Sequence, residues 1–145
     1  MSDSNGLQRV VVGLVIVRDR AALVLQRSTT EDVLPGLWEL PSGKKEFGES
    51  CQEAALREAY EETHLRIRLG EPCHVFDYVL DKAGQGARDT TQISFLATTI
   101  GDDEPRLSSE HQALAWVGPA ELGSVEMSDH TRAAIRTGLA KMTAD

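Results

Sequence analysis

The sequence predicts an α/β protein in which helices cover a central mixed β-sheet. Two apolar segments near the start of the chain, residues 10–17 and 21–27, have the length and composition of buried strands. A helix signal follows in the middle of the chain, more strand-like segments come after it, and a second helix signal stands near the end. Strands on both sides of one central helix are typical of layered α/β folds with a mixed sheet.

Turn signals place the strands and loops. Residues 18–20 separate the first two strands and have the length of a tight turn. The stretch 28–45 contains two prolines and two glycines, so we expect it to be irregular apart from a short extended piece at 37–40. Further strands are expected at residues 65–69, 73–80, 90–99 and 113–117, with a hairpin loop at 82–87.

Capping signals place the two helices. Ser50 and Glu53 form a capping box, and residues 54–63 contain no glycine or proline, so a helix is expected there. Its predicted core-facing residues are Leu56, Ala59, Tyr60 and Thr63. Ser128 is expected to cap a final amphipathic helix. The apolar residues spaced along that helix are Ile135, Leu139 and Met142.

Length, charge and cysteine content limit the class of protein. The 145 residues favour one domain, residues 1–145, and we expect about residues 1–6 and 143–145 to be disordered. The net charge of −8 argues against a nucleic-acid polymer as partner. No apolar run approaches the roughly 18 residues that cross a bilayer, and no export signal is present, so we expect no membrane partner. Cys51 and Cys73 are too few for a disulfide framework, which favours a cytoplasmic protein. We expect a monomer or a homodimer.

Three glutamates are gathered on one face of the first helix. At about 100° per residue, Glu61 and Glu62 lie roughly −60° and +40° from Glu58. Like charges at these spacings destabilise a helix by about 0.2–0.5 kcal/mol per pair. A divalent cation would turn the repulsion into attraction, and ligands that are all oxygen suit Mg²⁺ or Mn²⁺. The alternative is an acidic face that is only solvated. In either case we expect Glu58 to face solvent, so that its replacement by Gln leaves folding largely intact.

These glutamates belong to a longer pattern. It reads Gly43, five residues, Glu49, seven residues, Arg57-Glu58, two residues, Glu61-Glu62. The pattern resembles the signature of the Nudix hydrolases. The resemblance implies an α/β fold of the Nudix type, an α/β/α sandwich with a central mixed β-sheet, the signature helix on one side and a C-terminal helix. His64 stands where the family has a glycine, at a helix end where the left-handed conformation is expected.

The resemblance also implies a reaction. Nudix hydrolases cleave a nucleoside diphosphate linked to a further group, by metal-assisted attack of water on phosphorus. Mg²⁺ is the implied cofactor, with Mn²⁺ as an alternative. Glu58 and Glu62 are the implied direct ligands, and Glu61 is implied to bind the ion directly or through water. The backbone carbonyl of Gly43 is a further candidate ligand.

Other positions of the pattern imply supporting roles. Arg57 is expected to orient the glutamates, and Glu49 is expected to tie the preceding loop to the helix. The general base stays open between Glu58 and Glu110, which lies in a loop before a strand. The alternative for Glu110 is an ordinary solvated loop residue.

Six residues are candidates for substrate binding. Arg27, Lys44 and Lys45 are placed to contact phosphate groups, although each also fits a solvated surface charge. Phe76 and Tyr78 share one face of a strand, and they either stack on a nucleobase or belong to the core. Asp129 begins the last helix, where it either reads the base or stabilises the helix N-terminus.

Within the Nudix family, the leading prediction is a MutT-like (d)NTP pyrophosphohydrolase that releases a monophosphate and pyrophosphate. The small size of the chain and the segment 37–44, LWELPSGK, favour it. The main alternative is an ADP-ribose or nucleotide-sugar pyrophosphatase, and dinucleoside polyphosphates also stay open. A non-catalytic domain that senses nucleotides is the alternative from another class. In every case the partner is a small-molecule nucleotide.

Overall fold

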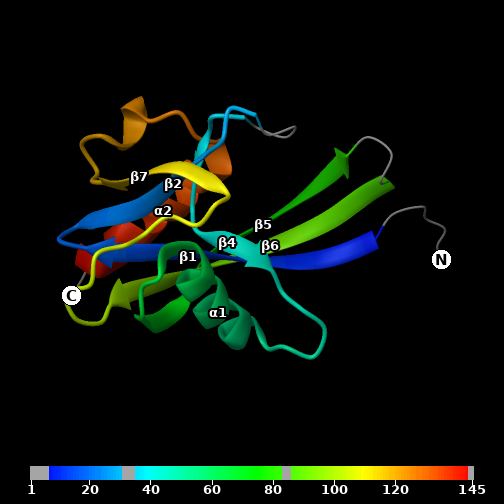
Figure 1. Ribbon diagram of the computed structural model, residues 1–145, viewed down its shortest axis with the longest axis horizontal. Coiled ribbons are helices and arrows are strands. Elements are labelled where there is room, and N and C mark those ends of the chain that lie inside the picture. Colours follow the sequence, from blue (N-terminus) through cyan, green and yellow to red (C-terminus); the bar gives the residue numbers. More distant parts are fainter. Residues whose placement is uncertain (1–6, 31–34, 83–85, 144–145) are drawn as a thin grey trace.

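The computed structural model describes residues 7–30, 35–82 and 86–143 (Figure 1). The strands are β1 (Leu7–Arg18), β2 (Ala21–Arg27), β3 (Trp38–Glu39), β4 (Ser42–Lys44), β5 (Ile67–Lys82), β6 (Gly86–Thr99) and β7 (His111–Val117). The helices are α1 (Cys51–Thr63) and α2 (Asp129–Thr143), with a short 3₁₀ helix, η1 (Leu122–Ser124), before α2.

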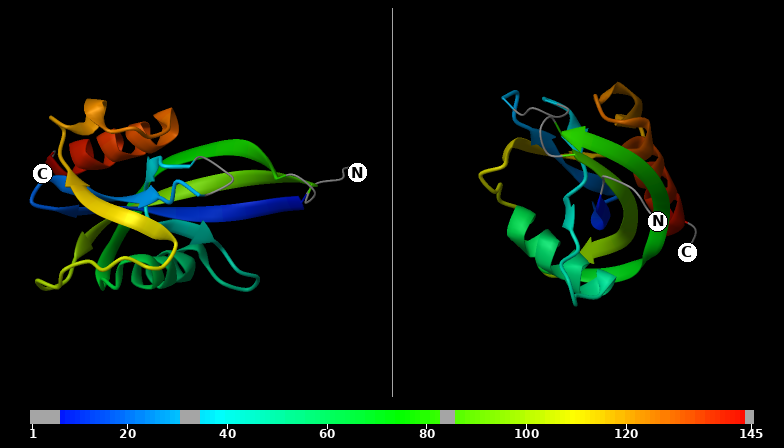
Figure 2. Two further views of the ribbon diagram at one scale, coloured as in Figure 1. Left: turned by 45° about the horizontal axis from the view of Figure 1, so that its top comes forward. Right: turned by 90° about the vertical axis from the view of Figure 1, so that its right-hand side faces the viewer.

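The seven strands of the described residues form one mixed sheet. Its main path has the order β3-β2-β1-β6-β5, while β4 pairs with β1 and β7 pairs with β2. β1 is parallel to β6 from Leu7 to Val17 and antiparallel to β2 and β4. Figure 2 shows α1 and α2 on opposite sides of this sheet. The predicted α/β/α sandwich with a central mixed sheet is therefore confirmed.

β1 is buried on both faces, which explains its long apolar run. Val12, Leu14 and Ile16 belong to a first core cluster under α1, and Val15 and Val17 belong to a second cluster under α2. Because alternate residues of a strand point to opposite faces, a strand between two helices needs apolar residues at successive positions. The helices cover these clusters with Ala54, Ala55 and Ala59 from α1, and with Ala134, Ile135 and Leu139 from α2.

The inward face of α1 differs from the prediction. Leu56 and Tyr60 are 46% and 53% exposed, whereas Glu58 and Glu62 are only 9% and 8% exposed. The prediction of core contacts for Leu56 and Tyr60 is therefore wrong, and so is the expectation that Glu58 faces solvent. Alanines on the inward face let α1 pack closely against the sheet, and the two glutamates are carried inward with them. The remaining residues of the predicted face are buried, Ala59 and Thr63.

Residues 65–69 and 73–80 do not form two strands. Most of both segments belongs to β5, which runs through Pro72 with a shift of register against β6 on either side of that residue. Among the described residues β5 pairs only with β6, so it is an edge strand. Edge strands tolerate proline, and a bulge absorbs the irregularity. Pro72 is therefore accommodated inside one strand.

The predicted caps are present at both helices. The Ser50 hydroxyl accepts a hydrogen bond from the Glu53 N–H, and the Glu53 carboxylate accepts one from the Ser50 N–H, at 3.0 and 2.8 Å. At α2 the Ser128 hydroxyl accepts a bond of 3.1 Å from the Thr131 N–H. His64 ends α1 in the left-handed conformation, with φ of 62°. Both helix starts and the unusual end of α1 follow the prediction.

Parts of three predictions fall outside the described residues. They are residues 1–6 and 144–145 of the expected disordered termini, residues 31–34 of the expected irregular stretch, and residues 83–85 of the expected hairpin loop. Residue 143 belongs to α2 instead. Within the part of the chain that is described, no helix is long and apolar enough to span a bilayer.

Candidate active site

A cleft of about 710 Å³ is lined by residues from all the strands and both helices named above. The predicted site residues that line it are Arg27, Gly43, Lys44, Glu62, Phe76, Tyr78 and Glu110. Arg57, Glu58 and Glu61 lie on α1. Of these, Glu58 lies directly against Gly43, which lines the cleft. Asp129 is exposed and does not line the cleft, although its neighbours Ser128 and His130 do.

Gly43 allows α1 to bring a carboxylate against β4. A Cβ atom at position 43 would lie 2.0 Å from Glu58 Cδ and 2.2 Å from each Glu58 carboxylate oxygen. Only a residue without a side chain permits this approach. Glu62 is held against the same strand, because its Oε1 accepts a hydrogen bond of 2.9 Å from the Ser42 N–H. Two carboxylates of α1 thus face the backbone of β4.

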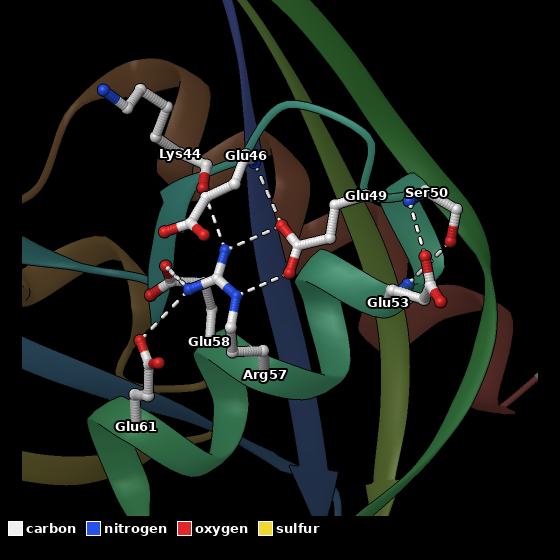
Figure 3. Close-up of polar contacts among 8 residues, drawn as sticks. All are labelled: Lys44, Glu46, Glu49, Ser50, Glu53, Arg57, Glu58 and Glu61. Carbon is white, nitrogen blue, oxygen red and sulfur yellow. Dashed lines mark hydrogen bonds and ion pairs between the residues drawn. The ribbon is translucent and has the colours of Figure 1, made fainter.

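The Arg57 guanidinium joins the loop before α1 to the helix (Figure 3). Its Nε and Nη2 donate to the two carboxylate oxygens of Glu49 at 2.6 and 2.9 Å. Its Nη1 donates to Glu58 at 2.7 Å and to Glu61 at 3.1 Å. Nη2 also donates to the Lys44 carbonyl at 3.0 Å. The side-chain bond from Arg57 and a backbone bond from the Glu46 N–H lower the pKa of Glu49 to about 2. One cation thus contacts three carboxylates.

Burial changes the proton affinity of the two inward carboxyl groups. Desolvation raises the pKa of Glu62 to about 7, although the hydrogen bond from Ser42 opposes the shift. Desolvation also raises the pKa of Glu58, against the opposing effect of Arg57. Burial disfavours the ionised form of a carboxyl group unless a cation is close. The site is therefore able to attract a positive ion.

The donor set at this point fits a hard divalent cation. The candidate donors are carboxylate and carbonyl oxygens, the ligand class that Mg²⁺ and Mn²⁺ prefer. The Glu58 carboxylate fills the space left by the missing side chain of Gly43, which brings carboxylate and backbone together. Among the described residues, no three acidic, histidine or cysteine side chains already have the spacing of a metal site. Arg57 contacts one oxygen of Glu58, Oε2, and one oxygen of Glu61, Oε1, and a carboxylate can accept such a bond while its other oxygen binds a cation.

A buried histidine connects the start of β7 to β3. His111 Nε2 lies 2.8 Å from Glu39 Oε2, and Arg27 Nη1 lies 3.4 Å from the same oxygen. Burial by itself would lower the pKa of His111, but the hydrogen bond to Glu39 and the charges of Glu62, Glu39 and Glu110 raise it above its ordinary value. Glu39 was not predicted as a site residue. The available signal was its position between two apolar residues in the extended piece 37–40.

Stacked rings line the part of the cleft between β5 and the start of α2. Phe76 stacks on His130 with 4.1 Å between ring centroids and 4° between ring planes. Tyr78 stacks on Phe76 at 5.4 Å and 26°. His130 was not predicted, and the sequence carries no local signal that brings it to Phe76. The rings present an apolar surface of the kind on which nucleobases stack.

A model of the NUDIX domain matches residues 7–138, which cover the whole sheet, α1 and most of α2. The chain belongs to the Nudix family. The Nudix signature is complete at its glutamates and its arginine, and His64 departs from it while keeping the left-handed backbone that the replaced glycine would take.

Two Nudix relatives carry names that state a substrate. A Mycobacterium tuberculosis protein provisionally named 8-oxo-dGTP diphosphatase 2 is 37% identical over 120 residues, which are 83% of this chain and 80% of that protein. Nucleoside triphosphatase NudI from Escherichia coli is 30% identical over 134 residues, covering 89% of this chain and 95% of that protein.

Solved Nudix structures share the fold. The MutT NUDIX hydrolase from Burkholderia pseudomallei has a TM-score of 0.74 and 28% identity, covering 90% of this chain and 97% of that one. The MutT protein from Methanosarcina mazei Go1 has a TM-score of 0.79 and 23% identity, covering 99% of this chain and 100% of that one. This Nudix protein is therefore a MutT-like enzyme of the pyrophosphohydrolase class.

Proposed function

We propose that this Nudix protein is a Mg²⁺-dependent hydrolase of nucleoside diphosphate-X compounds, and specifically a (d)NTP pyrophosphohydrolase that releases a nucleoside monophosphate and pyrophosphate. The observation that carries the proposal is the pair of buried carboxylates, Glu58 and Glu62, held against β4 beside a cleft with stacked aromatic rings. Such a cleft can take charged phosphates at one end and a flat base at the other. The names of the two relatives, an 8-oxo-dGTP diphosphatase and a nucleoside triphosphatase, support a triphosphate as substrate.

The metal would be held by α1 and β4. Glu58, Glu62 and the Gly43 carbonyl are the proposed ligands, with Glu61 binding directly or through water. When bound, Mg²⁺ neutralises the phosphate groups and polarises their oxygens for attack. Arg57 keeps the glutamate side chains on one side of the helix, because it is itself anchored to the loop before α1. A chain with a net charge of −8 needs such neutralisation to hold an anionic substrate.

Two carboxylates are candidates for the general base that accepts a proton from the attacking water. Glu110 is exposed and lines the cleft at the start of β7. Glu58 is buried, and Arg57 stabilises its ionised form. The base is the residue whose replacement by Gln abolishes the acidic limb of the pH–rate profile, because that limb reports protonation of the base. The other replacement is expected to leave this limb in place.

The remaining proposed contacts bind the two ends of the substrate. Arg27 lines the cleft beside Glu39, and Lys44 lines it next to Gly43. Both would contact phosphate oxygens. Phe76 and Tyr78 would stack on the base, after it displaces or joins the ring of His130. Stacking on one base is worth about 1–3 kcal/mol, enough to position the nucleoside without reading its identity.

A hydrolysis screen with Mg²⁺ tests the proposed function. Canonical and oxidised (d)NTPs, ADP-ribose, nucleotide sugars and dinucleoside polyphosphates are the substrates, and phosphate and pyrophosphate release are measured separately. Pyrophosphate from one or more triphosphates is the expected result. Turnover confined to ADP-ribose, a nucleotide sugar or a dinucleoside polyphosphate would overturn the choice of substrate. Metal-dependent binding without any turnover would indicate a nucleotide sensor.

Some expectations from the sequence stay predictions. They are a single domain over residues 1–145, a cytoplasmic location, the absence of nucleic-acid and membrane partners, and a monomeric or homodimeric state.

A further inference from the structure

A second cleft, of about 580 Å³, adjoins the candidate active site. We call it the outer cleft, and its defining residues are Arg9, Lys44, Lys45, Phe47 and Arg88. Arg9 and Lys44 line both clefts, so the two spaces share a boundary. A ligand anchored in the active site can therefore extend into the outer cleft.

The outer cleft is cationic in an acidic protein. Among the described residues, four lysines and arginines line it, and Glu46 is the acidic residue of that lining. The chain as a whole carries a net charge of −8. Positive charge concentrated in a concave surface raises the local concentration of anions. The outer cleft is therefore suited to an anionic ligand that the rest of the surface repels.

Strand pairing brings these cations together from distant parts of the chain. β1 lies between β4 and β6, so Lys44 stands on one side of it and Arg88 on the other. Arg9 lies opposite Thr90 in the pairing with β6, and its Nε donates to the Thr90 hydroxyl at 2.8 Å. The charge of Arg9 also opposes the rise that burial gives the pKa of Tyr78, a member of the aromatic wall of the first cleft. Arg9 is thus fixed at the boundary between the two clefts.

An aromatic side chain stands uncovered at the edge of the outer cleft. Phe47 is fully exposed, and it belongs to the loop that the bonds between Glu49 and Arg57 tie to α1. A phenylalanine that buries none of its ring on folding gains no hydrophobic stabilisation there. Its position beside four cations offers a stacking surface next to an anion site.

We propose that the outer cleft binds the phosphate groups that lie beyond the scissile bond, so that the enzyme selects nucleotides with a chain of three or more phosphates. The proposal rests on the proposed function of the first cleft. Arg9 and Lys44 mark the boundary that the phosphate chain crosses, and Lys45 and Arg88 bind its distal end. The tail of a nucleoside triphosphate and the bridge of a dinucleoside polyphosphate share this chemistry. Only the second would bring a further base to Phe47.

Binding of inorganic tripolyphosphate to the metal-free protein tests the outer cleft without any turnover. Calorimetric titration compares the wild type with Lys45→Ala and Arg88→Ala, and with Arg136→Ala, an exposed cation on α2, as the matched control. Each outer-cleft variant is expected to weaken binding by about tenfold, the loss of one charge-assisted contact, and the control to bind as the wild type. Equal affinity in all four proteins would overturn the proposal. Arg88 also donates to the Gly86 and Ala87 carbonyls, so its replacement can affect folding, which thermal melts check. If Arg88→Ala fails to fold, the comparison of Lys45→Ala with the wild type and the control decides the test.

Kinetics separate this site from the first cleft. The two variants are expected to lower kcat/KM about tenfold for a nucleoside triphosphate, with little change for the matching diphosphate. An equal loss on both substrates would contradict the outer cleft. Phe47→Ala identifies the source of the phosphate chain: a loss only on dinucleoside polyphosphates indicates a second base, and no loss indicates a free tail.

The two proposals can fail independently. A wild-type protein that hydrolyses no nucleotide, but binds tripolyphosphate through Lys45 and Arg88, would refute the proposed function and keep the outer cleft as an anion site. Normal turnover of triphosphates together with tripolyphosphate binding that ignores both residues would refute the outer cleft alone.

Discussion

The carboxylate of Glu58 occupies the space that a side chain at position 43 would need. A Cβ atom there would lie 2.0 Å from Glu58 Cδ, so any residue larger than glycine pushes the carboxylate away from β4. Gly43 and Glu58 therefore work as one unit, one supplying the space and the other the charge. The burial of the Glu58 carboxylate is set by the backbone of β4 and by the position of α1. The rotamer of Glu58 alone does not determine it.

Glu58→Gln is expected to lower kcat by about 10²–10⁴-fold, the usual range for a group that takes part in proton transfer or charge stabilisation. The midpoint of thermal unfolding is expected to stay unchanged or to rise, because Gln keeps the shape of the side chain and removes a charge that burial disfavours. Pyrophosphate release and thermal melts on the same sample measure both. Glu126→Gln, at an exposed glutamate away from α1, is the control. Full turnover in the Glu58 variant would remove this residue from the catalytic site.

At the scale of elements, α1 shows which features of a helix local sequence predicts and which it does not. Its start, its capping box and its left-handed end were predictable, because capping and propensity depend on neighbouring residues. Its inward face was not, since the largest apolar residues, Leu56 and Tyr60, turned out to be exposed. Hydrophobic periodicity ranks helix faces by apolar content, whereas the inward face of α1 carries small alanines and two carboxylates. β5 covers most of the two strands expected at 65–69 and 73–80, because an edge strand accommodates Pro72 with shifts of register against β6.

A pair of variants on α1 tests this orientation. Ala55→Leu is expected to destabilise the fold by about 1–3 kcal/mol, because the wild-type side chain is fully buried in the first core cluster and leaves no room for added methyl groups. Leu56→Ala, one residue further, is expected to change the free energy of unfolding by at most about 0.5 kcal/mol, since it is half exposed. Urea denaturation of both proteins gives the comparison. The reverse ranking would show that α1 packs with its other face inward.

The contact between Glu49 and Arg57 attaches the loop before α1 to the helix, and we expect its contribution to stability to depend on pH. Its hydrogen bonds lower the pKa of Glu49 from 4.5 to about 2, so its contribution to stability is fully present above pH 4.5 and is lost as the pH falls toward 2. Glu62, whose pKa is raised from 4.5 to about 7, changes stability in the opposite direction as the pH falls, and it does so equally in both proteins compared below. Thermal midpoints measured from pH 6 to pH 2 are expected to fall less steeply for Glu49→Gln than for the wild type. Parallel curves would mean that this ion pair does not stabilise the fold.

At the scale of the whole molecule, the cleft depends on contacts between residues far apart in sequence. The signature glutamates were predictable because one helix holds them at fixed spacing. Glu39 with His111, and Phe76 with His130, meet only after the sheet and α2 have packed, so no local pattern indicated them. The sequence therefore predicted that the glutamates lie together on α1, whereas the contacts between distant elements could not be predicted.

The same assembly leaves the protein with two buried carboxylates on one helix and a net charge of −8, so a cation that binds there is expected to stabilise the whole fold. A ligand that binds only the folded state at ten times its Kd adds about 1.4 kcal/mol, and in a chain of this size that raises the thermal midpoint by roughly 3–6 °C. Adding Mg²⁺ after chelator treatment is expected to produce this rise in the wild type and a smaller one in Glu62→Gln, with Na⁺ at equal ionic strength as the control. A midpoint that responds equally to both salts would show that only screening acts, and that α1 and β4 do not bind the ion without a nucleotide.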